Sequence, residues 1–271
     1  MSTATFSIAE LTELEDLREL AELFAVVWGR PGEPPIISDI LKALAHSGNY
    51  VSGAYVDKRL VGGLVGWFGG VPPHELHVHS HILGVVTGSD AHGLGFELKQ
   101  HQRRWCLARG VKVIEWTTDP LVRRNAYFNL TKLGAQAREY LINVYGEMTD
   151  GINAGEESDR LLIRWRLDSP SAEAAGAGRA PEPQLDELVR DGAATVLSVG
   201  EAGEPLQTAS SSRVLLCQVP DDIVALRRSN PALARSWRVA LRKTLTDAIA
   251  AGYKVSGATR SGWYVLETGA N

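Results

Sequence analysis

The feature that most constrains the fold is a succession of strand, glycine-bearing loop, helix and strand between residues 76 and 117. The segment LHVHSHILGVV (76–86) alternates in side-chain type, which is typical of a β-strand. A loop from Gly88 to Gly95 leads into a segment whose apolar residues recur at helical spacing, namely Leu94, Leu98, Trp105 and Ala108. The segment VKVIEWT (111–117) then predicts a buried strand. Because a helix joins the two strands, we expect a parallel pair and an α/β fold.

The flanking segments predict more strands and helices. Two strand-like runs, 50–57 and 60–68, are separated by a short turn and predict a hairpin. The spacing of apolar residues, together with the glycines and prolines that interrupt it, predicts the remaining elements: helices at 14–28, 38–46 and 119–134, and strands at 137–145 and 161–167.

The composition excludes several classes of protein. The chain has 271 residues, 44% of them hydrophobic and 22% charged, which is enough apolar surface for a core. Its net charge of -4 lacks the basic excess that nucleic-acid-binding proteins usually have. No apolar run reaches the roughly 18 residues of a membrane span, and the acidic first segment lacks an apolar signal core. We therefore expect a cytoplasmic protein that binds neither nucleic acid nor membrane.

A change of composition near residue 168 predicts the domain organisation. Residues 1–168 carry the elements described above and are expected to form one domain. Residues 169–184 are rich in Ala, Gly and Pro and are typical of a linker or long loop. Residues 185–271 predict a C-terminal α+β extension, and we expect it to pack on the first domain because its helix needs a partner for one apolar stripe: Leu233, Trp237, Leu241, Leu245 and Ile249.

The loop before the predicted helix at residue 94 has the chemistry of a phosphate site. The first N–H groups of a helix have no partner within the helix, and the helix end carries partial positive charge. Gly93 and Gly95 would let a large anion approach the backbone closely. A loop that needs glycine only for its backbone geometry is the alternative. Neither a Walker loop nor a complete dinucleotide-binding fingerprint is present.

The order of elements in residues 1–168 resembles the GNAT superfamily of acyl-CoA-dependent N-acyltransferases. The resemblance rests on the loop Asp90-Ala91-His92-Gly93-Leu94-Gly95, on Leu133-Gly134, and on pieces such as SHILGV, IEWTTDPL and NAYFN. It implies a mixed, mostly antiparallel sheet with a splayed parallel pair, flanked by helices, plus the smaller C-terminal segment. It also implies a little-characterised branch of predicted acetyltransferases with a C-terminal extension.

The resemblance also implies roles for particular residues. Acetyl-CoA or a larger acyl-CoA would be the co-substrate, with its pyrophosphate on the loop that contains Asp90, His92, Gly93, Leu94 and Gly95. Backbone N–H groups of the strand near Gly84 to Val86, with Val85 and Val86 as the expected contacts, would polarise the acyl carbonyl. Asn125 would contact the pantetheine arm. The family's usual tyrosine position holds Leu130, so Tyr127 is the candidate general acid in its place.

Three histidines, His77, His79 and His81, lie two residues apart, so a regular strand would place all three on one face. His79 and His81 are candidates for a general base, because imidazole titrates near neutral pH and amine acylation releases a proton. A histidine with only a structural hydrogen bond is the alternative, and no metal is expected. Of the nearby carboxylates, Glu115 could orient an amine, whereas Asp119 before Pro120 fits a helix cap.

We therefore expect an N-acyltransferase that moves an acyl group from CoA to a small-molecule amine. The alternatives are a non-catalytic module that binds a CoA ester or another phosphate-bearing metabolite, and a different reaction of an acyl-CoA. A homodimer is left open by the sequence.

Overall fold

The computed structural model describes residues 6–70, 73–86, 88, 93–146 and 157–269. Contacts divide the chain into two compact units. The first comprises Met1–Trp116 with residues 150–152, and the second comprises Thr117–Thr149 and Asn153–Asn271.

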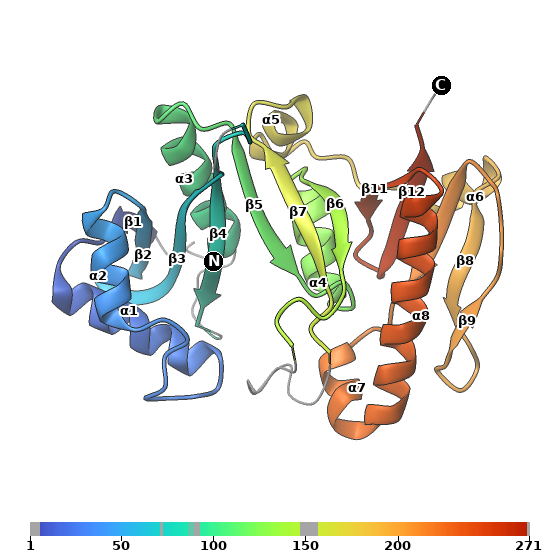
Figure 1. Cartoon of the computed structure of the whole chain (residues 1–271), viewed down its shortest axis with the longest axis horizontal. Coiled ribbons are helices and arrows are strands. Elements are labelled where there is room, and N and C mark those ends of the chain that lie inside the picture. The colour runs from blue at the N-terminus through green and yellow to red at the C-terminus, as the bar shows by residue number, and fades with distance from the viewer. Residues whose placement is uncertain (1–5, 71–72, 87, 89–92, 147–156, 270–271) are drawn as a thin grey trace. The chain divides into compact units, whose positions relative to one another are not determined.

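The first unit is built on a sheet in which strands β1 to β5 follow one another in space in chain order. Neighbouring strands are antiparallel, except that β4 and β5 are parallel and α3 connects them. The strands are β1 (Phe6–Glu10), β2 (Tyr50–Val56), β3 (Arg59–Gly69), β4 (His77–Val85) and β5 (Val113–Thr118), the last of which ends in the second unit. The helices are α1 (Leu14–Val27), α2 (Ser38–His46) and α3 (Leu94–Ala108) (Figure 1).

Two adjacent glycines of β3 allow helices to approach both faces of this sheet. A Cβ atom at Gly63 would lie 2.2 Å from Leu20 of α1, and a Cβ at Gly62 would lie 3.3 Å from Leu94 of α3. Because successive residues of a strand point to opposite faces, α1 and α3 lie on opposite sides of the sheet. The apolar stripe of α1, with Leu17 and Phe24 fully buried, forms the core on its side.

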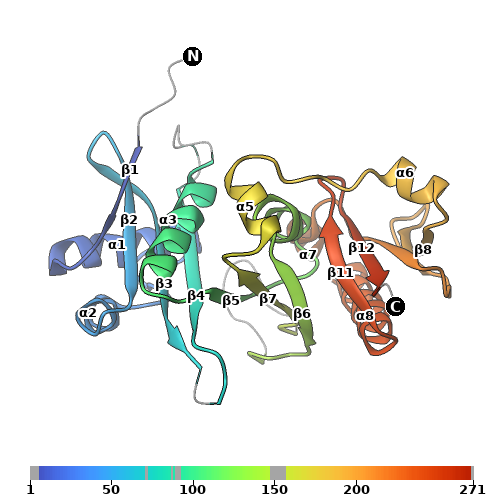
Figure 2. The same ribbon diagram turned by 90° about the horizontal axis from the view of Figure 1, so that it is seen from above.

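The second unit contains the hairpin β6 (Gln136–Leu141) and β7 (Arg160–Arg166) and a five-stranded sheet in the order β11-β12-β10-β8-β9. The strands of that sheet are β8 (Ala194–Val199), β9 (Pro205–Gln207), β10 (Val214–Gln218), β11 (Tyr253–Ala258) and β12 (Trp263–Thr268). The helices of the unit are α4 (Arg123–Ala126), η1 (Tyr127–Lys132), α5 (Pro170–Gly176), α6 (Leu185–Arg190), α7 (Ile223–Ser229) and α8 (Pro231–Ala250). Figure 2 shows β11 and β12 side by side next to α8.

Helix α8 confirms the predicted C-terminal helix. Asn230 caps it by accepting the N–H of Leu233 at 3.1 Å, and Pro231 occupies its first turn. Trp237, Leu241 and Leu245 are fully buried. The predicted stripe therefore faces the interior of the unit, as apolar spacing of this kind requires.

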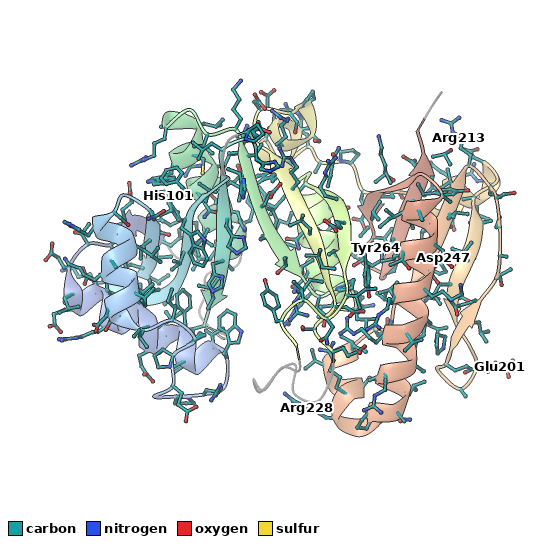
Figure 3. The ribbon with its side chains drawn as sticks, in the orientation of Figure 1. His101, Glu201, Arg213, Arg228, Asp247 and Tyr264 are labelled. Carbon is teal, nitrogen blue, oxygen red and sulfur yellow. The ribbon has the colours of Figure 1, made fainter. Side chains whose placement is uncertain are left out.

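In the second unit, residues of the C-terminal extension form hydrogen bonds with residues more than a hundred positions earlier in the chain. Thr131 Oγ1 donates to the carbonyl of Ala258 at 2.5 Å, and the Tyr264 hydroxyl donates to the carbonyl of Pro120 at 2.7 Å (Figure 3). The compact units consequently divide after Trp116, within the stretch predicted as one domain. The predicted boundary near residue 168, and packing of the extension on the earlier residues, stay predictions.

Two local expectations need correction. The single helix expected at 119–134 is a four-residue α4 followed by the π-helix η1. The expected linker at 169–184 contains α5, which Ser169 caps by accepting the N–H of Ala172. The fold class itself is confirmed, with a mixed, mostly antiparallel sheet that includes a parallel pair, flanking helices, and a second, smaller sheet. Within the described ranges, no helix has the length and apolar character that crossing a membrane requires.

Candidate active site

Strand β4 is irregular at His81. Val65 of β3 lies opposite Ile82, but the next β3 residue, Gly66, lies opposite Ser80. His81 is therefore an additional residue in β4, which is the arrangement of a β-bulge. The strand is therefore not regular at His81, but burial still alternates through the bulge: Val78, Ser80 and Ile82 are buried, whereas His77, His79 and His81 are not. The three histidines consequently lie on the less buried face of β4, in agreement with the face that their spacing predicts.

Strands β4 and β5 pair over a short distance only. Among the described residues, Val78 lies opposite Ile114 and His79 lies opposite Glu115, and β4 then continues to Val85 without a further β5 partner. The backbone N–H of Val86 donates to Val61 in β3 at 2.9 Å. Because successive backbone groups point to opposite edges of a strand, the N–H of Val85 points to the edge away from β3. This edge of β4 offers backbone groups to a bound molecule.

The predicted phosphate loop leads into α3 as expected. Gly93 is the N-cap residue with φ of +85°, a conformation that favours glycine. Its carbonyl accepts the N–H groups of Phe96 and Glu97, while the N–H groups of Gly93, Leu94 and Gly95 have no partner within the helix. An added Cβ at Gly95 would only contact Leu83, at 3.7 Å. The helix start can therefore present three donors to an anion; Asp90 and His92 lie outside the described residues.

The rings of Trp67, His79 and His81 form a cluster at the bulge. The ring centroid of Trp67 lies 4.5 Å from that of His81 and 5.1 Å from that of His79, and the two imidazoles are 5.7 Å apart. Burial, the neighbouring histidines and Lys99 together lower the pKa of His79 to about 4. Desolvation also lowers the pKa of His81. Both imidazoles are consequently neutral at neutral pH and can accept a proton.

His77 has separate contacts. Its Nδ1 lies 3.2 Å from the carbonyl of Glu75, and its Nε2 lies 3.6 Å from a carboxylate oxygen of Glu115. Across the described ranges, no three or more His, Cys, Asp or Glu side chains are grouped in a way that could hold a metal ion.

A buried lysine that the sequence reading missed lies where β4 and β5 part. Lys99 Nζ donates to Ser80 Oγ at 2.8 Å and lies 3.7 Å from the ring centroid of Trp116. Ser80 and Trp116 each follow the last β4–β5 partners. Burial lowers the pKa of Lys99 to about 7. The sequence contains one sign of this burial. Lys99 lies seven positions before Cys106, so both residues fall on the same buried face of α3.

The candidates Asn125 and Tyr127 belong to the second unit. Asn125 lies in α4, and Tyr127 begins the π-helix η1, an element that is frequent at functional sites. The Tyr127 ring is half-buried, with the guanidinium of Arg260 at 4.9 Å from its centroid. Leu130, where the sequence resemblance leads one to expect a tyrosine, is buried.

Asp119 is not a helix cap. α4 begins at Arg123, and Asp119 instead accepts from Arg227 at 2.5 Å and from Arg238 at 2.8 and 3.0 Å. Burial alone would raise the pKa of Asp119, but the two arginines hold it well below its usual range. Because all three side chains are buried, removing the carboxylate would leave two buried arginines without this counter-charge.

Comparison with solved structures finds similar acetyltransferases. An acetyltransferase of the GNAT family from Streptococcus pneumoniae matches 60% of this chain and 99% of its own, with 14% identity and a TM-score of 0.49. Arabidopsis thaliana Naa50, solved in complex with a bisubstrate analogue of CoA, matches 59% and 97%, with 18% identity and a TM-score of 0.46. An aminoglycoside 6'-acetyltransferase type Ii matches 60% and 98%, with 17% identity and a TM-score of 0.47.

No family model and no curated protein matches the sequence. The chain is thus similar in structure to known acetyltransferases, at 14–18% sequence identity.

Proposed function

We propose that the protein is an acyl-CoA-dependent N-acyltransferase whose acceptor is a small amine. The observation that carries the proposal is the β4 strand, which has an unpaired edge from Ser80 to Val85 in the described part of the sheet and a bulge at His81 beside that edge. The unpaired edge of β4 supplies backbone groups for a ligand, and the start of α3 supplies an anion site. The neutral imidazoles of His79 and His81 supply a base, and all of these features lie in the first unit.

Acyl-CoA binding would use the backbone. The N–H groups of Gly93, Leu94 and Gly95 would donate to the pyrophosphate, and the partial positive charge of the α3 N-terminus would add to this. The N–H of Val85 would donate to the thioester carbonyl, where negative charge develops during attack. Val86 is less suited because its N–H is directed to β3.

Acyl transfer would begin when the nitrogen lone pair of the amine attacks the thioester carbon. The C–N bond forms, the proton leaves the nitrogen for the imidazole of His81 or His79, and the C–S bond then breaks. The CoA thiolate leaves into solvent and takes a proton there. A neutral imidazole suits this role because it must accept a proton during each turnover.

The first test is a calorimetric titration with acetyl-CoA and CoA. Gly93→Trp should abolish binding, because the indole would occupy the anion site. Gly110→Trp is the matched control: Gly110 follows the other end of α3, also has positive φ, and, like Gly93, would place a Cβ in open space. Binding that survives Gly93→Trp would rule out the loop as the CoA site.

A second assay separates catalysis from binding alone. Release of CoA from acetyl-CoA is measured with a panel of primary amines, alongside a sample without amine. Amine-dependent release supports acyl transfer. Tight CoA binding without release for any amine would favour the non-catalytic binding module, and release without amine would favour thioester hydrolysis.

A further inference from the structure

An apolar pocket in the first unit opens beside His81, in the middle of β4. Its volume is about 640 Å³, within the range of small-molecule sites. The loop before α2, α2 itself and the end of β3 supply most of its lining, which consists of Pro35, Ile36, Ile37, Ile40, Leu44, Asn49, Trp67, Phe68 and His81.

The lining carries one ionisable side chain among these described residues, the imidazole of His81. Asn49 is engaged within the fold, since its Oδ1 accepts the N–H of Phe68 at 2.9 Å and its Nδ2 donates to Ser47 at 2.9 Å. No carboxylate of the described lining could neutralise a cationic ligand. The pocket therefore favours a molecule that is apolar except at one end.

Several apolar side chains of the pocket are exposed to water. Ile37 and Ile40 are 51% and 50% exposed, and Phe68 is 37% exposed. A contiguous exposed apolar surface of this kind marks binding sites, because covering it with an apolar ligand removes it from water.

We propose that this pocket binds the apolar body of the acceptor, so that the substrate is a primary amine on an alkyl or arylalkyl chain, with its nitrogen at His81. This inference rests on the proposed function and narrows it, because it disfavours polyamines and aminoglycosides, whose several ammonium groups need acidic partners. An apolar pocket also favours the neutral, nucleophilic form of the amine, since desolvation disfavours the ammonium ion.

The test compares n-butylamine, n-hexylamine and n-octylamine with spermidine at saturating acetyl-CoA. We expect kcat/KM to rise roughly two- to fourfold per added methylene, as burial of CH₂ groups predicts, and to be lowest for spermidine. A higher kcat/KM for spermidine than for hexylamine would overturn the inference while leaving the proposed function standing.

The variant Ile40→Asp places a carboxylate in the pocket and should raise KM for n-hexylamine at least tenfold, with KM for acetyl-CoA unchanged. Val26→Asp is the matched control, because Val26 is also 50% exposed on a helix of the same unit but does not line the pocket. An unchanged KM for hexylamine in Ile40→Asp would overturn the inference.

If no amine is acetylated at all, the proposed function fails, and direct calorimetric titration with n-hexylamine then decides the pocket. Binding to the unmodified protein and to Val26→Asp, but not to Ile40→Asp, supports the pocket as an apolar-amine site. Absence of binding to the unmodified protein overturns it.

Discussion

The imidazole of His81 lies closer to the indole of Trp67 than the imidazole of His79 does, with centroid distances of 4.5 Å and 5.1 Å, although His79 is the residue opposite Trp67 in the ladder. The additional residue in β4 accounts for this, since a bulge re-aims the side chains next to it. As a result both rings share one aromatic neighbour, and His81 also lines the apolar pocket.

The first prediction concerns the choice of base. His81→Gln should lower kcat about 10²- to 10⁴-fold, the usual contribution of a general base, and His79→Gln should have a smaller effect because His79 does not line the pocket. His77→Gln serves as the control, since His77 contacts Glu75 and Glu115 instead. Steady-state kinetics with n-hexylamine measure the effects, and full kcat in His81→Gln would exclude it as the base.

The second prediction concerns pH. The pKa of His79 is about 4, because burial, His81, His77 and Lys99 all disfavour its charged form and Glu115 opposes them only in part. Since the pKa of His81 is lowered as well, both bases are neutral from mildly acidic pH upward. We expect kcat/KM to rise with pH through the pKa of the amine.

A comparison of n-hexylamine with the weaker base benzylamine checks this. The pH at which kcat/KM rises should be lower for benzylamine, because its amine has the lower pKa. A rise that stays near the ordinary histidine pKa for both amines would contradict it.

The third prediction concerns Lys99. Burial lowers its pKa to about 7 from 10.5, so the unfolded chain binds a proton more readily than the folded chain between these values. Burying the charged Lys99 side chain therefore lowers the free energy of unfolding by its full amount below pH 7, and this loss disappears as the pH rises toward 10.5. Lys99→Met should therefore raise the free energy of unfolding by about 2–4 kcal/mol at pH 7, with the gain shrinking at pH 10.

Urea unfolding at the two pH values measures this effect. A Lys99→Met protein that is less stable at pH 7 would mean that the contacts with Ser80 and Trp116 outweigh the cost of burying the charge.

The fourth prediction concerns Asp119. Asp119→Asn would leave Arg227 and Arg238 buried without their counter-charge, which should cost about 3–5 kcal/mol of stability. The control is Asp247→Asn on α8 (Figure 3). The Asp247 carboxylate is exposed and pairs with Lys243 at 2.7 Å, so this substitution should cost less than about 1 kcal/mol of stability. Urea unfolding of both variants tests this. Equal losses of unfolding free energy would show that the buried Asp119 contributes no more to stability than an exposed ion pair does.

The same cluster should give a pH dependence. The pKa of Asp119 is held below its ordinary value by Arg238 and Arg227, despite the opposing effect of burial. Its stabilisation is therefore present above the ordinary pKa of 3.8 and is lost as pH falls below it. Asp119→Asn should lose this part of the acid sensitivity, which thermal unfolding between pH 3 and pH 6 would detect.

The sequence by itself determined the elements that depend on neighbouring residues. Helical spacing of apolar residues predicted α8, and two glycines followed by an apolar stripe predicted the beginning of α3. The order strand, loop, helix, strand predicted the parallel pair β4 and β5. These features follow from local propensity and periodicity, which a short window of sequence contains.

Only the tertiary structure decided the features that carry the candidate site. The bulge at His81 depends on the register between β3 and β4, and the burial of Lys99 depends on where α3 crosses the sheet. The role of Asp119 depends on two arginines more than a hundred residues away. The division of the chain after Trp116 depends on contacts throughout both units. Such relationships arise from long-range packing, and no local pattern encodes which distant side chain will come to lie against a given residue.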